Sequence, residues 1–109
     1  MSKFLKAFLF ASVIFAPFAA SAVTVASWGG AYTESQKKAY ADTYSDPSSI
    51  VFENYNGGLG EVRAQVESGS VTWDIVDVLP SDAITGCDEG LFEDISSEIA
   101  ANAAPGPDG

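Results

Sequence analysis

The sequence predicts an α/β fold with a mainly parallel sheet, and three observations lead to this prediction. Short runs rich in β-branched residues recur along the chain, helical patterns of about ten residues separate them, and turns containing Gly or Pro punctuate the alternation. Parallel strands need crossover connections of this kind. The expected element order is β-α-β-α-β-α in a chain of 109 residues.

The amino-terminal segment has the pattern of a secretory signal peptide. Two lysines precede the uncharged and largely apolar run 7–18, and Ala20-Ser21-Ala22 forms an A-x-A cleavage site. The apolar run is shorter than the roughly 20 residues that a membrane-spanning helix needs. We therefore expect residues 1–22 to be removed by cleavage after Ala22, which leaves an exported domain over residues 23–109.

The first strand, helix and second strand are predicted from local patterns. Residues 23–27 are a short β-branched run, which predicts the first strand. Thr33 lies three residues before Gln36, a capping-box pattern that predicts a helix over residues 34–44. An Asp-Pro-Ser-Ser turn ends this helix, and residues 50–55 are predicted as the second strand.

The middle of the chain repeats the alternation. A turn over residues 56–58 leads to a predicted helix over residues 59–68, in which Val62 and Val66 share one face. Gly69 is expected to stop this helix. The Gly-rich turn lacks the Lys-Ser/Thr pair of a P-loop and does not fit the dinucleotide-binding fingerprint, so we interpret it as a flexible connection.

The last part of the chain supplies one more strand and helix. Residues 73–78 are predicted as the third strand, which ends at Pro80. Ser81 is expected to cap a helix over residues 81–89. Residues 91–95 should pack back as a short extended piece, and the tail 100–109 has the composition of a loop.

Charge and composition exclude several classes of function. The net charge is −10, which argues against nucleic acid and anionic membrane partners and is compatible with a cationic ligand. The chain has no His, so histidine acid–base, triad and metal chemistry are excluded within these residues, and we expect no cofactor, no metal and no catalytic residue. Arg63 is expected to pair with Glu67, four residues on.

Cys87 is the one cysteine of the sequence, so it cannot form a disulfide within the chain. An odd cysteine in an exported chain indicates a free thiol or a missing partner. Together with the loop-like tail, it leads us to interpret the chain as an incomplete piece of a longer protein.

The segment after the first predicted strand contains the first candidate ligand-binding residues. Open α/β sheets bind ligands at the carboxyl ends of their strands. Trp28 and Tyr32 offer flat apolar walls there, and an ammonium group over such a ring gains roughly 0.5–2 kcal/mol. The alternatives are that Trp28 is a core residue that covers the end of the sheet and that Tyr32 packs against the first helix. Gly29 and Gly30 either bring their N–H groups close to a ligand or simply make the turn.

The end of the third predicted strand supplies the other candidates. Asp77 has an apolar neighbour on each side and needs a partner if it is buried. Asp77 and Asp82 are placed to pair with an ammonium group, and Ser81 to cap its helix while facing a cleft. Helix starts at Thr33 and Ser81 would instead favour an anionic solute. Asp74 is expected to have a structural role at the start of its strand.

Three segments resemble bacterial extracellular solute-binding proteins, the periplasmic receptors of ABC importers. They are residues 23–32, which contain the Trp-Gly-Gly turn, residues 73–81 and residues 89–95 with a Gly-Leu-acidic pattern. The resemblance is nearest to the spermidine/putrescine-type group. It implies two α/β lobes that are joined by a hinge and close on the ligand. Residues 23–109 would supply only the beginning of the first lobe, with the second lobe absent.

The resemblance also implies roles for individual residues. In polyamine receptors of this kind, aromatic residues sandwich the aliphatic stretch and carboxylates bind the ammonium ends. Trp28 and Tyr32 match the aromatic loop after the first strand, and Ser81 matches the serine that ends the third strand. The acidic residues that define polyamine specificity mostly lie outside these residues. The implied protein is a periplasmic monomer that passes a polyamine-like solute to an inner-membrane ABC permease.

Three alternatives remain open at this point. One is a solute-binding protein for an anionic or zwitterionic ligand. Another is an exported enzyme fragment with Ser81 as nucleophile, although Ser81 has neither a His or Lys partner in the sequence nor a G-x-S-x-G elbow. The last is a small acidic interaction module that is complete once the signal peptide is removed.

Overall fold

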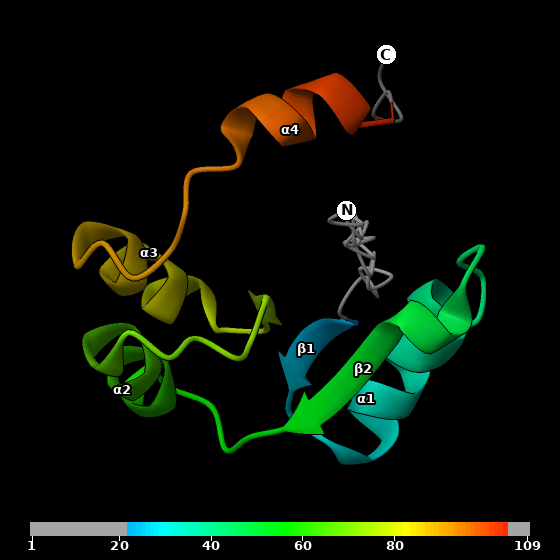
Figure 1. Ribbon diagram of the computed structural model, residues 1–109, viewed down its shortest axis with the longest axis horizontal. Coiled ribbons are helices and arrows are strands. Elements are labelled where there is room, and N and C mark those ends of the chain that lie inside the picture. Colours follow the sequence, from blue (N-terminus) through cyan, green and yellow to red (C-terminus); the bar gives the residue numbers. More distant parts are fainter. Residues whose placement is uncertain (1–21, 105–109) are drawn as a thin grey trace, which may run out of the picture.

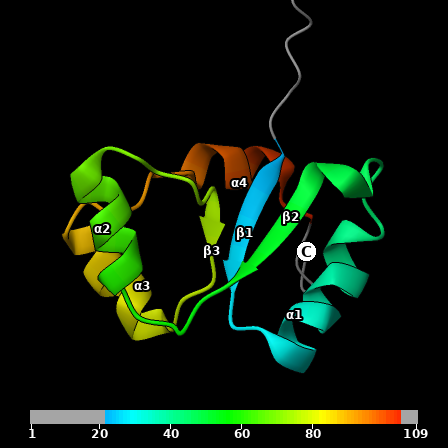
Figure 2. The same ribbon diagram turned by 60° about the horizontal axis from the view of Figure 1, so that its bottom comes forward.

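A parallel sheet of three strands lies at the centre of the computed structural model, which describes residues 22–104. The strands are β1 (Val23–Ser27), β2 (Ile50–Asn54) and β3 (Ile75–Val76), in the order β2-β1-β3 (Figure 2). Helices separate the strands along the chain, so the predicted α/β class with a parallel sheet is confirmed. Residues 1–21 of the predicted signal peptide lie outside the described residues.

The ladder between the strands fixes which residues meet at the ends of the sheet. β1 pairs with β2 along its whole length, from Val23 opposite Ile50 to Ser27 opposite Asn54. β3 is much shorter than the predicted strand 73–78, because only its two residues pair with β1 and it has no second neighbour among the described strands.

Asp74 confirms the structural role that the sequence predicts for it. Its carboxylate accepts a hydrogen bond from the Thr24 N–H at 2.8 Å, and its own N–H donates to the Thr24 carbonyl at 2.9 Å. These two bonds fasten the chain to β1 just before β3 begins, so they set the register in which β3 pairs.

The first helix begins earlier than the sequence predicts. α1 (Gly30–Gln36) follows directly after the β1 turn and continues as the π-helical segment η1 (Lys37–Ala41), beside β2 (Figure 1). The predicted cap at Thr33 is therefore wrong. Thr33 lies inside α1 and is buried, and its Oγ1 accepts a hydrogen bond from the Gly29 N–H at 2.8 Å. The 3-10 turn η2 (Pro47–Ser49) then leads into β2.

The next two helices lie side by side beyond β3 (Figures 1 and 2). They are α2 (Gly60–Ser68) and α3 (Pro80–Asp88). The predicted stop Gly69 follows α2 and Gly90 follows α3, and both glycines have positive φ. The predicted cap at Ser81 is wrong, because α3 already begins at Pro80 with Leu79 in the cap position. Proline suits the first turn of a helix because its missing N–H would have no partner there.

The end of the described chain contains a helix that the sequence analysis does not predict. α4 (Ser96–Asn102) occupies residues that include the start of the predicted loop tail. Asp94 accepts a hydrogen bond from the Ser96 N–H at 2.9 Å, which satisfies a donor at the start of the helix. Residues 91–95 form no strand, but the ring of Phe92 lies against Gly86 of α3.

The buried hydrophobic residues are Ala26 of β1, Ala41 of η1, Tyr55 and Leu59 between β2 and α2, and Val62 of α2. Ala26 lies on one face of the sheet, because side chains alternate along a strand. The other face of the sheet carries Val23, Val25, Ile50, Phe52 and Ile75, which line a cavity of about 510 Å³ beneath α1 and η1. We call this the sheet-face cavity. Parallel sheets are usually covered on both faces, and here α1 and η1 cover this face only in part.

Within residues 22–104, none of the helices combines the length and the apolarity needed to cross a bilayer.

Candidate functional site

The carboxyl ends of all three strands meet at one edge of the sheet. The chain passes from central β1 to β2 on one side and then to β3 on the other, so the order reverses between β1 and β3. Ligands of open α/β sheets bind outside the strand ends at such a switch point. A pocket of about 440 Å³ lies at this edge, and we call it the strand-end pocket. Its lining residues are Trp28, Tyr55, Asn56, Gly57, Gly58 and Leu79.

Trp28 is the predicted site residue that lines this pocket. Its side chain is 38% exposed, and its ring stacks on Tyr32 with centroids 5.2 Å apart and planes 23° apart. The indole N–H donates to the hydroxyl of Tyr55 at 3.2 Å. Tyr32 therefore covers one face of the indole and Tyr55 holds its polar edge, so the rest of the ring is what Trp28 offers to a ligand.

Tyr55 is a pocket residue that the sequence analysis missed. It was included in the second predicted strand, and nothing in the local pattern marks its hydroxyl. In the structure only 6% of Tyr55 is exposed. Its hydroxyl donates to the backbone carbonyl of Asp77, and its ring packs edge-on against Trp73, with centroids 5.3 Å apart. The available signal was its place directly after a strand, at the ligand-binding edge of the sheet.

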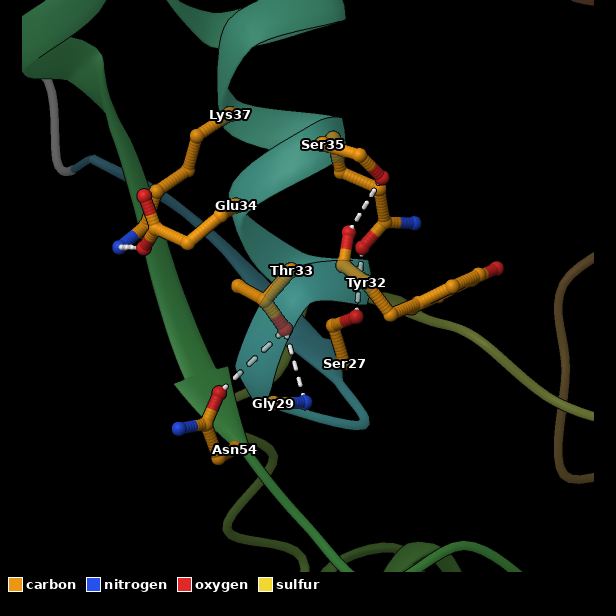
Figure 3. A network of polar contacts seen from close by, with 9 residues as sticks. Ser27, Gly29, Tyr32, Thr33, Glu34, Ser35, Lys37 and Asn54 are labelled. Atoms are coloured by element: carbon orange, nitrogen blue, oxygen red, sulfur yellow. Dashed lines mark hydrogen bonds and ion pairs between the residues drawn. The ribbon is translucent and has the colours of Figure 1, made fainter.

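The two glycines of the turn do not line the strand-end pocket. Figure 3 shows that the Gly29 N–H points at Thr33 Oγ1, which also donates to Asn54 Oδ1 at 3.5 Å. The N–H of Gly29 is therefore already used inside the protein. Gly30 is the first residue of α1, and both glycines have positive φ, as a sharp strand-to-helix turn requires.

Asp77 finds its partner in α1. Its carboxylate accepts a hydrogen bond from the Gln36 side-chain amide, whose oxygen accepts one from the Ser27 hydroxyl at 2.5 Å. The sequence analysis expects a buried Asp77 to need a partner, and Gln36 is that partner. The Asp77 side chain also lines the sheet-face cavity, together with Tyr32.

In the structure, the Asp77 carboxylate and the Tyr32 hydroxyl are close enough to interact electrostatically. Partial burial raises the pKa of the Tyr32 hydroxyl above its usual value, and the negative charge of Asp77 raises it further. Both effects disfavour the phenolate. Tyr32 therefore stays a neutral hydroxyl at physiological pH, available as a hydrogen-bond donor.

Ser81 and Asp82 lie on the first turn of α3 and line neither of the two cavities. Ser81 is exposed, and its carbonyl accepts a hydrogen bond from the Thr85 hydroxyl at 3.0 Å. The charge of Asp82 acts on Arg63 of α2. The pKa of Arg63 is raised first by its hydrogen bond to Glu89 and, more weakly, by acidic neighbours that include Asp82.

The expected ion pair of Arg63 with Glu67 is wrong. Arg63 instead binds Glu89 through two hydrogen bonds, at 2.6 and 2.8 Å. A forked guanidinium matches a carboxylate well in this geometry, and it ties α2 to the end of α3. Cys87, on the same helix end, is exposed and carries a free thiol.

The described site is built from aromatic rings, amides, hydroxyls and one carboxylate. Among residues 22–104, no cluster of three Cys, Asp or Glu side chains is placed to hold a metal ion. Such a set of groups binds a small molecule by stacking and hydrogen bonding, and the same groups appear in the pockets of small-molecule receptors.

Comparison with known proteins points in the same direction. The chain is 42% identical over 73 residues to the gamma-aminobutyric acid-binding protein of Pseudomonas aeruginosa. The match covers 65% of this chain and 21% of that protein, so the chain spans about a fifth of the relative's length. No family model matches the chain. The relative is named as a binding protein and not as an enzyme, which supports a solute-binding function for this chain.

Proposed function

We propose that residues 23–109 form part of the first lobe of an exported solute-binding protein, and that the strand-end pocket holds the alkyl and ammonium part of a small linear primary amine. The observation that carries this proposal is the position of Trp28. A partly exposed indole lies at the switch point of a parallel sheet, beside a pocket, in a chain similar to a solute-binding protein.

The chemistry of the wall favours an alkylammonium ligand. The indole N–H is already donated to Tyr55 and Tyr32 stacks on one face of the ring, so Trp28 has its other π face left to offer. An ammonium group beside such a surface gains roughly 0.5–2 kcal/mol, and an alkyl chain gains by burial. The residues that line the pocket include no cationic side chain, and the net charge of −10 attracts cations.

Two ligands fit this class. The relative's name makes gamma-aminobutyric acid the first candidate, and the resemblance to polyamine receptors makes putrescine or spermidine the second. Both kinds of molecule carry a primary ammonium group on an unbranched carbon chain. The proposal concerns that shared part, which the aromatic wall would hold in either case.

The wider setting is also part of the proposal. A signal peptide over residues 1–22 would deliver the protein to the periplasm. A second lobe outside these residues would close over the ligand, and an ABC permease of the inner membrane would receive it. The partly covered sheet face beneath α1 supports the expectation that further chain completes the first lobe.

Calorimetric titration of the full-length protein tests the ligand class. The panel is gamma-aminobutyric acid, putrescine, spermidine and, as a matched control, butyrate, which keeps the carbon chain and carboxylate but lacks the ammonium group. Saturable binding of at least one amine with no heat from butyrate is expected. Equal binding of butyrate and gamma-aminobutyric acid would contradict the proposal, because the ammonium group would then contribute nothing.

A further inference from the structure

We propose that Tyr55 is a positioning residue for the aromatic wall: its hydroxyl fixes the indole of Trp28 relative to the ends of the three strands and so sets how tightly the amine binds. The part that concerns binding rests on the function proposed above. The part that concerns the indole rests on the geometry of the free protein.

The backbone around Tyr55 is held by the sheet itself. The Tyr55 N–H donates to the Ser27 carbonyl at 2.9 Å, and the Asp77 N–H donates to the Ala26 carbonyl at 3.0 Å. The ladder therefore continues past the ends of β2 and β3, and both residues sit at fixed distances from the end of β1. Trp28 directly follows Ser27, the last residue of β1, where the backbone leaves the sheet.

The side chain of Tyr55 then connects all three strand ends. Its hydroxyl accepts the indole N–H of Trp28 and donates to the carbonyl of Asp77, so both of its strong hydrogen-bonding directions are used. The indole N–H is a donor only, so the direction of both bonds is unambiguous. A hydroxyl that donates to a carbonyl is polarised and becomes a better acceptor.

The ring of Tyr55 is held independently of its hydroxyl. It packs edge-on against Trp73, and only 6% of the residue is exposed. Tyr55→Phe therefore removes the hydroxyl and leaves the packed ring in place. Without the bond, the indole of Trp28 keeps its stacking on Tyr32 but loses its hydrogen bond, and it gains freedom that ligand binding must remove.

The first test reads the state of Trp28 in the full-length protein without ligand. In a protein with ¹⁵N-labelled tryptophan, the indole N–H resonance that is lost in the Trp28→Phe variant is assigned to Trp28. We expect Tyr55→Phe to shift the Trp28 resonance and to speed its hydrogen exchange with water. Tyr44→Phe is the matched control, since Tyr44 is 55% exposed and does not line the strand-end pocket. An unchanged Trp28 resonance in Tyr55→Phe would overturn the proposal.

The second test reads binding by calorimetry with gamma-aminobutyric acid and putrescine as probes. Loss of one hydrogen bond that orders the wall should raise Kd by about three- to tenfold in Tyr55→Phe and leave it unchanged in Tyr44→Phe. If Trp28→Ala abolishes binding while Tyr55→Phe keeps the original Kd, Tyr55 has no positioning role. If Trp28→Ala binds normally, the proposed role of Trp28 in ligand binding is wrong. The NMR test does not depend on that role, because it measures the Trp28–Tyr55 hydrogen bond in the protein without ligand.

Discussion

Substitution of Gly29 tests whether the turn after β1 has the geometry described here. Gly29 has φ 82° and ψ −175°, a region of backbone conformation that is essentially restricted to glycine. Placing another residue there costs about 1–3 kcal/mol. A Cβ on Gly29 would also lie 3.3 Å from Cγ of Asn54, tighter than ordinary van der Waals contact. Gly29→Ala should therefore lower the free energy of unfolding by about 2 kcal/mol or more.

Gly60→Ala is the matched control, because the chemical change is the same and the surroundings differ. Gly60 is the first residue of α2, has no positive φ, and a Cβ there would meet no atom within 4 Å. This substitution should be neutral or stabilising by up to about 1 kcal/mol. Urea unfolding of the full-length protein, followed by far-UV circular dichroism, measures both. A Gly29→Ala variant as stable as the original protein would refute the described turn.

Three further predictions follow from packing and charge. Gly86→Ala should destabilise the protein, because the new Cβ collides with the ring of Phe92 and overpacking costs about 1–3 kcal/mol, more than the gain in helix propensity; increased stability in urea would contradict this. Arg63 lowers the pKa of Glu89, so their bond stabilises the fold at neutral pH and is lost as the pH falls through that lowered pKa. The difference in Tm between the original protein and Glu89→Gln should therefore shrink on acidification, and a constant difference would contradict the assignment. Burial and Asp77 raise the pKa of Tyr32, so NMR titration of labelled tyrosine should show a lower pKa in Asp77→Asn, whereas an unchanged pKa would exclude the charge effect.

The elements that local patterns encode were predicted correctly from the sequence. The β-branched runs of β1 and β2 and the glycine stops after α2 and α3 depend on residues close in the chain. Helix starts were less predictable. Thr33 looks like a cap, but Gly29 turns the chain so sharply that the helix begins before Thr33, whose hydroxyl bonds back to the turn.

Interactions between distant residues were beyond sequence reasoning. Arg63 has Glu67 one turn away, yet it binds Glu89, because α2 and α3 lie side by side. The apolar neighbours of Asp77 indicated that its carboxylate needs a hydrogen-bond partner. Nothing in the local sequence indicates that this partner is Gln36, which lies 41 residues earlier.

The candidate site was predicted in part. Trp28 and Tyr32 were expected to form an aromatic wall, and they stack on each other at the switch point of the sheet. Their roles in binding, and those of Asp77, Ser81 and Asp82, stay predictions. Tyr55 was missed because its importance comes from three strand ends that meet only in the folded chain.

The most direct test of the central claim is calorimetric titration of gamma-aminobutyric acid and putrescine into the full-length protein and its Trp28→Ala variant. Tyr40→Ala is the control, since Tyr40 is an exposed aromatic residue that does not line the strand-end pocket. We expect the original protein and Tyr40→Ala to bind the same amine with similar Kd, and Trp28→Ala to lose at least tenfold in affinity, about 1.4 kcal/mol. Equal affinity in Trp28→Ala would contradict the claim that this indole forms the wall of the ligand site.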